Sequence, residues 1–186
     1  MLDYFEPPVR RVFPKGWREC SHWREPVCIG RYVVTCSSLF AGARAKTDGL
    51  LPPPDYGIYL AGQWREKLGD IWTNGATIRS VARERPYPAL VIDWMDMAGM
   101  TPDKLNQLVE ICRNKMRQGK SIDIGCLQGH GRSGTLLACL LARVEHLSAA
   151  RAVEEVHWRY CQHAVETQSQ QKAVEEYVRQ YGIRRR

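Results

Sequence analysis

Short apolar runs mark the strands that the sequence predicts. Residues 27–35 are rich in β-branched side chains, and residues 56–60 and 89–93 are almost continuously apolar. Apolar runs of this length are typical of strands that are buried within a sheet. Residues 120–125 are expected to form a further strand, which leads directly into a glycine-rich segment.

Helical periodicity dominates the second half of the chain. Residues 101–119 begin with a Thr-Pro pair suited to the N-cap and the first helical position, continue with apolar residues at helical spacing, and end on glycine. Residues 136–146 are apolar on most faces, which predicts a central helix. Two more helices are expected, one over 148–160 and one that begins at Thr167 or Ser169 and ends near residue 182.

The order of these elements predicts the fold class. Strands that alternate with helices favour an α/β fold with a mostly parallel central sheet flanked by helices. Ligands in such sheets bind at the carboxyl ends of strands, which places candidate sites after residues 91–93 and 122–125. No internal linker divides the chain, so we expect one domain, with residues 1–50 as an N-terminal arm and first strand packed on a core of residues 51–186.

Composition and charge restrict the setting and the partners. The 186 residues carry a net charge of +7, which favours anionic partners such as phosphorylated proteins, nucleotides or nucleic acid. The N-terminus lacks the basic start and apolar run of a signal peptide, and the longest apolar candidate, residues 136–141, is too short to span a membrane. These features, with an odd number of scattered cysteines that does not suggest a disulfide framework, predict a cytoplasmic protein.

Four residues near the N-terminus have the side chains of zinc ligands: Cys20, His22, Cys28 and Cys36. Their spacing contains no Cys-x2-Cys pair, and Cys28 falls inside a predicted strand. We therefore interpret the cysteines as core residues, and we expect no metal and no cofactor.

The glycine-rich segment after the strand at 120–125 predicts a phosphate-binding loop. Gly129, Gly131 and Gly134 allow a tight turn whose backbone N–H groups point inward, and the following helix directs its positive end to the same place. Arg132 offers a planar fork of donors that suits two phosphate oxygens. A Walker-type loop is excluded, because the lysine that it requires is missing.

Cys126 precedes this loop, where the field that binds phosphate also stabilises a thiolate. A thiolate that faces bound phosphate is a nucleophile directed at phosphorus, and the Ser133 hydroxyl could donate to the sulfur when it leaves. Cys126, five residues, and then Arg132 with Ser133 resemble the signature loop of the protein tyrosine phosphatase superfamily. The chain departs from the superfamily at Gly125, where a histidine is usual.

The resemblance covers roughly residues 55–180, is strongest over 90–136, and implies further site residues. The segment Trp94-Met95-Asp96 is similar to the family's mobile Trp-Pro-Asp loop, so Asp96 is the expected general acid and Asp93 the competitor that more naturally anchors the loop. Gln170, or Gln168, could orient the hydrolytic water, as in compact dual-specificity phosphatases. The residues expected to bind phosphate are Leu127, Gln128, Gly129, His130, Gly131 and Arg132.

Together these features predict a cysteine-dependent phosphatase that cleaves phosphomonoesters through a phosphocysteine intermediate. The compact length resembles the dual-specificity branch, which implies phosphotyrosine substrates on proteins and also phosphoserine or phosphothreonine. An RNA 5′-phosphatase or triphosphatase of the same superfamily stays open because of the positive charge, and a phosphate-binding pseudophosphatase is the alternative from another class. Neither the oligomeric state nor the physiological substrate follows from the sequence.

Overall fold

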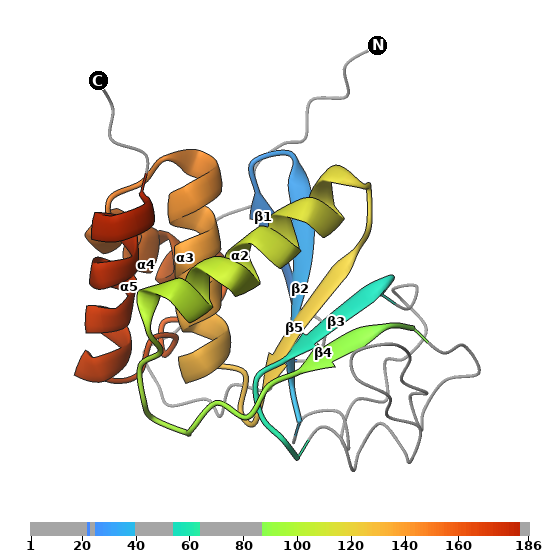
Figure 1. The fold of residues 1–186 in the computed structure, drawn as a ribbon, viewed down its shortest axis with the longest axis horizontal. Helices are drawn as coiled ribbons and strands as arrows, with labels where there is room; N and C mark the ends of the chain where they lie inside the picture. The colour runs from blue at the N-terminus through green and yellow to red at the C-terminus, as the bar shows by residue number, and fades with distance from the viewer. Residues whose placement is uncertain (1–21, 23–24, 40–53, 64–86, 183–186) are drawn as a thin grey trace.

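The computed structural model describes residues 22, 25–39, 54–63 and 87–182 (Figure 1). Most of the predicted N-terminal arm, including Cys20, lies outside the described residues. Within the described part, no helix combines the length and the apolar character that crossing a membrane requires.

Five strands form one sheet in the described part of the chain. The sheet has the order β1-β2-β5-β3-β4, and every neighbouring pair is parallel except β1 with β2. The predicted mostly parallel sheet is therefore confirmed. The strands are β1 (Glu25–Ile29), β2 (Tyr32–Ser38), β3 (Tyr56–Tyr59), β4 (Ala89–Val91) and β5 (Ile122–Cys126).

The prediction of one strand over residues 27–35 is wrong. This segment turns at Gly30 and forms the antiparallel hairpin of β1 and β2, with Ile29 opposite Tyr32. Gly30 has a φ of +55°, which glycine adopts without the steric cost that a side chain would add. The β-branched composition of the run is equally suited to both strands, so the single glycine was the signal that marked the turn.

The helices agree with the sequence pattern, with one difference. Thr101, Ser148 and Thr167 are N-caps, and Thr167 forms a capping box with Gln170. The central helix begins at Gly131, five residues before the predicted start, because the glycine-rich loop itself enters the first helical turn. The described helices are α2 (Pro102–Arg117), α3 (Gly131–Glu145), α4 (Ala149–Arg159) and α5 (Gln168–Tyr181).

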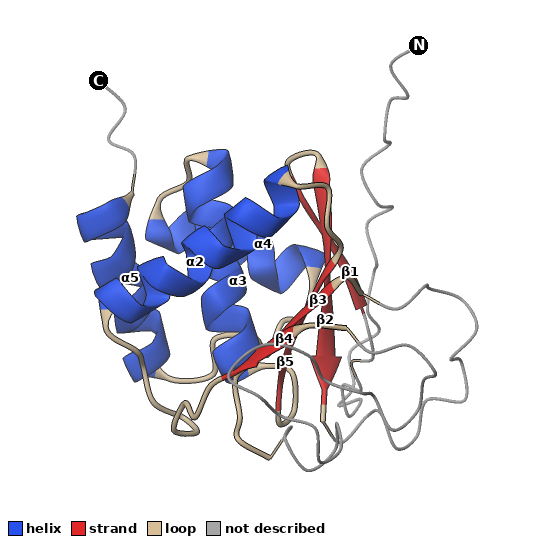
Figure 2. Ribbon diagram, turned by 45° about the vertical axis from the view of Figure 1, so that its right-hand side comes forward, coloured by secondary structure: helices blue, strands red, loops and turns tan. Residues whose placement is uncertain are grey.

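The helices gather on one side of the sheet, with α3 in contact with α2, α4, α5 and β5 (Figures 1 and 2). Every residue of α3 from Gly131 to Ala142 is buried, which explains why this helix is apolar on most faces. The loop between β5 and α3 is consequently fixed at both ends, by a central strand on one side and by a fully packed helix on the other. This arrangement positions the candidate site.

Candidate active site

The strand neighbours of β5 hold the base of the predicted phosphate loop. The Leu39 N–H donates to the Cys126 carbonyl over 3.0 Å, and the Ser38 hydroxyl donates to the Leu127 carbonyl over 2.9 Å. On the other side of β5, the Leu60 N–H donates to the Gly125 carbonyl. Cys126 thus lies at the carboxyl end of a central strand, which is the position that the sequence predicts for the site.

The loop bends over the sulfur of Cys126. The Gly129 N–H donates to the Cys126 Sγ over 3.2 Å, and the cysteine is only 2% exposed. Gly129 has a φ of +84°, a backbone conformation that turns its N–H toward the centre of the loop and favours glycine. An N–H directed at sulfur stabilises a thiolate and would also meet an oxygen of a bound anion.

Arg132 joins the phosphate loop to the predicted acid loop. Its guanidinium donates through Nη1 to the Trp94 carbonyl over 2.8 Å, and its Nη2 lies 2.9 Å from the Asp96 Oδ1. Arg132 is 3% exposed, whereas the Asp96 side chain is 57% exposed. The structure therefore brings the predicted acid and the predicted phosphate clamp into direct contact, with the carboxylate facing outward where a leaving group would lie.

Asp93, the competitor for the acid role, and Asp103, the next aspartate along the chain, occupy different places. A Cβ added at Gly62 would lie 2.2 Å from the Asp93 Oδ1, so the Asp93 carboxylate rests against the backbone that follows β3. Asp103 lies in the first turn of α2 and accepts hydrogen bonds from Gln180 and Tyr181 at the end of α5. Asp93 thus lies beside Gly62 and Asp103 binds side chains of α5, whereas Asp96 is the aspartate that pairs with Arg132.

Gln170 is fully buried beside the start of α3. Its Oε1 accepts from the backbone of Glu166 over 2.9 Å, and its Nε2 has no hydrogen-bond partner among the described residues. A Cβ added at Gly131 would lie 2.6 Å from that Nε2, so the unsatisfied amide faces the phosphate loop. Gln168, the alternative from the sequence, is exposed at the first position of α5.

The remaining predicted residues differ in what they face. Ser133 is completely buried, and its hydroxyl finds no hydrogen-bond partner in the described part of the chain. Leu127 packs against a small apolar cluster that includes Tyr59 and Val91, whereas Gln128 is exposed. His130, the N-cap residue of α3, is 9% exposed.

Three residues beside the loop were not predicted as site residues. The His22 carbonyl accepts from the Ser38 N–H, and the Tyr160 hydroxyl donates to the Gly129 carbonyl. Glu166 places its Oε1 3.8 Å from the His130 Nδ1. Burial raises the pKa of Glu166, and the nearby Asp96 raises it further. No local pattern marks His22 or Tyr160, because both are brought to the loop by tertiary packing.

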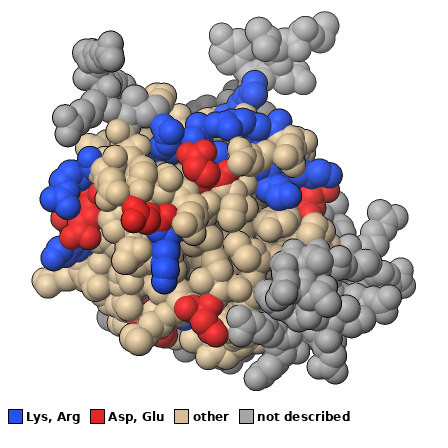
Figure 3. All heavy atoms as spheres, in the orientation of Figure 1, with Lys and Arg blue, Asp and Glu red and all other residues tan. Residues whose placement is uncertain are grey.

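The net positive charge is not gathered at this site on the face that Figure 3 shows. Lys and Arg side chains collect along its upper edge, whereas the end of β5 and the start of α3 lie at the lower side in the same orientation (Figures 1 and 3). Among the described residues, the groups at the site that attract an anion are the loop amides, the start of α3 and the buried Arg132.

Selective alkylation tests whether the loop activates Cys126. Iodoacetate at neutral pH is expected to modify Cys126 before every other cysteine, because its carboxylate fits the anion site and the Gly129 N–H favours the thiolate. Burial raises the pKa of Cys112 to about 12 and raises the pKa of Cys139 as well, so these thiols stay protonated. Peptide mass mapping would measure the order, with inorganic phosphate as protector. Faster modification of the half-buried Cys28, or no protection by phosphate, would contradict an activating loop.

Gly134 is required for packing and not for the turn of the loop. A Cβ at Gly134 would lie 2.7 Å from the Ala164 Cβ and 2.9 Å from the backbone nitrogen of Val165. Neither atom can swing away, so Gly134→Ala is expected to lower the free energy of unfolding by about 1–2 kcal/mol, despite alanine's better helix propensity. Denaturant unfolding would measure this, with Gly119→Asn as the control, since Gly119 is open and asparagine tolerates its φ of +72°. A stabilised Gly134→Ala protein would refute the close approach.

Sequence comparisons agree with the geometry. Residues 84–146 match the family described as "Polymorphic toxin system, DSP-PTPase phosphatase", a segment that contains Asp96, Cys126 and Arg132. Two uncharacterized proteins of Methanocaldococcus jannaschii are each 32% identical to the chain, over 92 and 94 residues. Each alignment covers 50% of this chain, and they cover 56% and 60% of the two relatives, so the chain matches little more than half the length of either.

Solved structures of phosphatases share the fold. The active form of Tk-PTP is similar with a TM-score of 0.60 and 23% identity, over 83% of this chain and 97% of that one. A kinase-associated phosphatase with its catalytic cysteine replaced by serine is similar with a TM-score of 0.62 and 11% identity, over 88% of this chain and 97% of that one. Human DUSP28 is similar with a TM-score of 0.58 and 16% identity, over 86% of this chain and 99% of that one. The chain therefore has the protein tyrosine phosphatase fold that these structures share.

Proposed function

We propose that this protein is a cysteine-dependent phosphatase that hydrolyses phosphomonoesters. One observation carries the proposal. The buried Arg132 follows a loop that bends over the Cys126 sulfur, and the same guanidinium holds the Trp94 carbonyl and the Asp96 carboxylate. A nucleophile, an anion clamp and an acid are thus assembled at one edge of the sheet. A pseudophosphatase would be expected to lack one of the three, and this chain retains all of them.

The geometry supports a two-step reaction. In the first step the Cys126 thiolate attacks phosphorus, an S–P bond forms, and the P–O bond to the leaving group breaks while Asp96 transfers its proton to the departing oxygen. In the second step water attacks phosphorus and gives a proton to Asp96, and the S–P bond breaks to restore the thiolate. The loop amides and Arg132 would hold the phosphoryl oxygens throughout. No metal takes part in this scheme.

Gln170 and Ser133 have supporting roles in the proposed reaction. The buried, unsatisfied Gln170 Nε2 faces the phosphate loop and is available to hold the attacking water. The buried Ser133 hydroxyl also lacks a partner in the described residues, and we assign it to stabilising the thiolate as it leaves. Because a buried polar atom without a partner is costly, both atoms are expected to gain a partner during the reaction.

We favour phosphotyrosine on proteins as the substrate, with phosphoserine and phosphothreonine as further substrates. Met95 and Met97 flank Asp96 with 78% and 54% exposure, and they offer an adaptable apolar surface where an aromatic leaving group would lie. One structural neighbour, PTPMT1, was solved in complex with PI(5)P. In this chain the loop residues 127–131 include no lysine to bind further phosphates of an inositide.

A substrate panel tests the proposal. The protein would be assayed with a phosphotyrosine peptide, a phosphoserine peptide, triphosphate-ended RNA and a phosphoinositide. We expect the highest kcat/KM for the phosphotyrosine peptide. Preferred hydrolysis of the RNA end would move the chain to the RNA 5′-phosphatase alternative, which its net positive charge keeps open. Phosphate binding without turnover of any of the four would identify a pseudophosphatase.

A further inference from the structure

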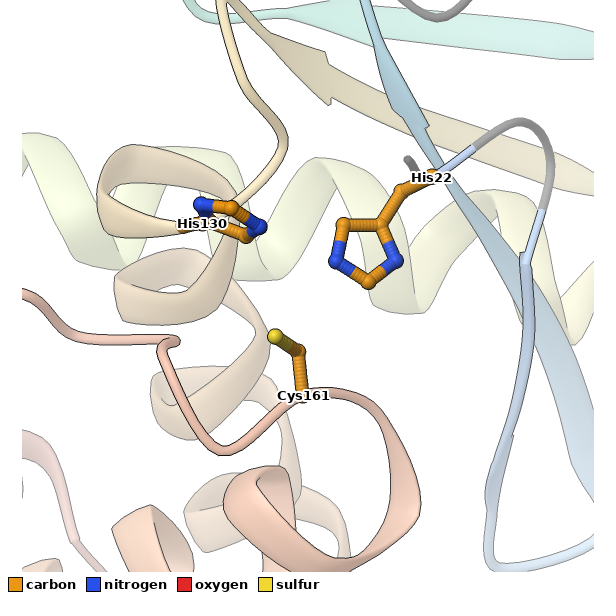
Figure 4. A group of neighbouring side chains, drawn as sticks. All are labelled: His22, His130 and Cys161. Atoms are coloured by element: carbon orange, nitrogen blue, oxygen red, sulfur yellow. The ribbon is translucent and has the colours of Figure 1, made fainter. Parts of the chain in front are cut away.

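Three side chains with metal-binding atoms converge behind the phosphate loop. His22, His130 and Cys161 each offer a ligand atom, and the three atoms lie within 4.8 Å of one another. Figure 4 shows the two imidazoles and the sulfur pointing toward a common space from three places in the chain: His22 on the N-terminal side of β1, the start of α3 and the turn after α4. This group differs from the zinc set that the N-terminal sequence suggested, which shares only His22 with it.

Both imidazoles have a nitrogen without a hydrogen bond. The Nε2 atoms of His22 and His130 are buried and lack a partner among the described residues, although the two histidines are only 7% and 9% exposed. A neutral imidazole carries a lone pair on one ring nitrogen, and such a lone pair suits a metal ion. Without a ligand, these buried nitrogens are a cost to stability.

The surroundings of His130 have the form of an outer shell around a metal ligand. Its Nδ1 lies 3.8 Å from the Glu166 carboxylate, which leaves the Nε2 as the ligand atom. Metal-bound histidines commonly donate their second N–H to a carboxylate, which fixes the ring, and Glu166 would have to come closer than 3.8 Å to accept that bond. Gly129 completes the enclosure, because a Cβ there would lie 3.3 Å from the His22 Cβ.

We propose that His22, His130 and Cys161 form a zinc-binding site. Two imidazoles and a thiolate are a ligand set that suits Zn²⁺. Tetrahedral zinc holds such atoms roughly 3.3–3.8 Å apart, so small rotations of the side chains would close the site. Cys161 would release its thiol proton to solvent on binding. The fourth position goes to water or to His163, whose ring centre lies 6.1 Å from that of His130.

The zinc would hold the phosphate loop in place without entering the reaction. His130 belongs to the loop, whereas His22 is bonded through its carbonyl to the end of β2, and Cys161 follows the Tyr160 that bonds Gly129. The bound ion would therefore join three segments that otherwise meet through these hydrogen bonds and ring contacts. We expect it to raise the melting temperature, because a ligand that binds only the folded protein stabilises it.

Zinc titration in the Cys126→Ser protein tests the site independently of catalysis, because this variant lacks the proposed nucleophile and its thiol. The metal-free protein would compete with a chromophoric chelator for Zn²⁺. One ion per chain is expected, with a higher melting temperature in its presence. Adding Cys161→Ser or His130→Gln should weaken zinc binding by more than about 10-fold. Even residues that only hydrogen-bond a metal ligand change metal affinity by about 10–100-fold, and these two substitutions remove a ligand itself.

Cys28→Ser and His146→Asn are the matched controls in the same background. Cys28 lies in β1, and His146 is exposed with a left-handed backbone that asparagine tolerates. Both should retain full zinc affinity. Absence of zinc binding, or equal affinity in the Cys161→Ser protein, would overturn the site. Should that variant fail to fold, cobalt substitution in the Cys126→Ser protein decides: a tetrahedral spectrum with thiolate charge transfer supports the site, and an octahedral one refutes it.

Discussion

Replacing Cys126 by serine should abolish phosphatase turnover and leave oxyanion binding intact. A serine hydroxyl stays protonated at neutral pH and is a far weaker nucleophile than a thiolate, so the Gly129 N–H that donates to the Cys126 Sγ would have no anion to stabilise. We expect a loss on the order of 10⁴-fold or more in kcat, since removing the nucleophile of a hydrolase costs up to about 10⁶-fold. A steady-state assay with nitrophenyl phosphate would measure it.

Binding of inorganic phosphate or tungstate separates chemistry from architecture in the same variant. The anion site consists of backbone N–H groups and Arg132, which the substitution leaves in place, so calorimetry should find an affinity close to that of the unmodified protein. Cys28→Ser is the control, because it removes a half-buried thiol from β1 and should change neither the turnover nor the affinity for the oxyanion. Phosphatase activity that survives in Cys126→Ser would refute the proposed mechanism.

The parts of the fold that follow from local patterns were predicted correctly. The apolar runs that became β3, β4 and β5 and the capped helices α2, α4 and α5 carry their signals within a few residues. The hairpin was missed because β1 and β2 together form one run of strand-forming residues, with Gly30 as the single sign of a turn. The early start of α3 was missed because glycines at 131 and 134 normally argue against a helix.

The residues of the site likewise divide into those that follow from sequence and topology and those that only tertiary packing brings together. Cys126 and Arg132 lie in one contiguous loop, and Asp96 follows a strand whose end meets the same sheet edge, so sequence and topology suffice to bring them together. His22 and Tyr160 reach Gly129 from positions 107 and 31 residues away in the sequence, and only tertiary packing brings them there. The need for glycine at Gly134 could not be predicted either, because its close contact with residues 164 and 165 leaves no pattern in the neighbouring sequence.

Asp96→Asn should slow phenyl phosphate far more than nitrophenyl phosphate. A general acid matters where the leaving oxygen is too basic to depart unaided, and nitrophenolate is a weak base that departs tolerably alone. We expect a loss of about 10²–10⁴-fold for phenyl phosphate, the usual contribution of acid catalysis, and a much smaller loss for the nitrophenyl ester. The asparagine carbonyl can still accept from Arg132, so the loop contact is retained. Single-turnover rates, in which phosphorylation of Cys126 is observed directly, would measure both losses.

The pH profile and two neighbouring aspartates make this prediction specific. The alkaline limb of kcat/KM reports deprotonation of the acid, so it should vanish in Asp96→Asn. Asp93→Asn should slow both esters by similar factors, because that carboxylate lies against the backbone at Gly62 and would act by positioning the loop. Asp103→Asn should change the rate for neither ester, since the partners of Asp103 lie at the end of α5. Equal sensitivity of both esters in Asp96→Asn, with the selective loss in Asp93→Asn or Asp103→Asn, would assign the acid to that residue.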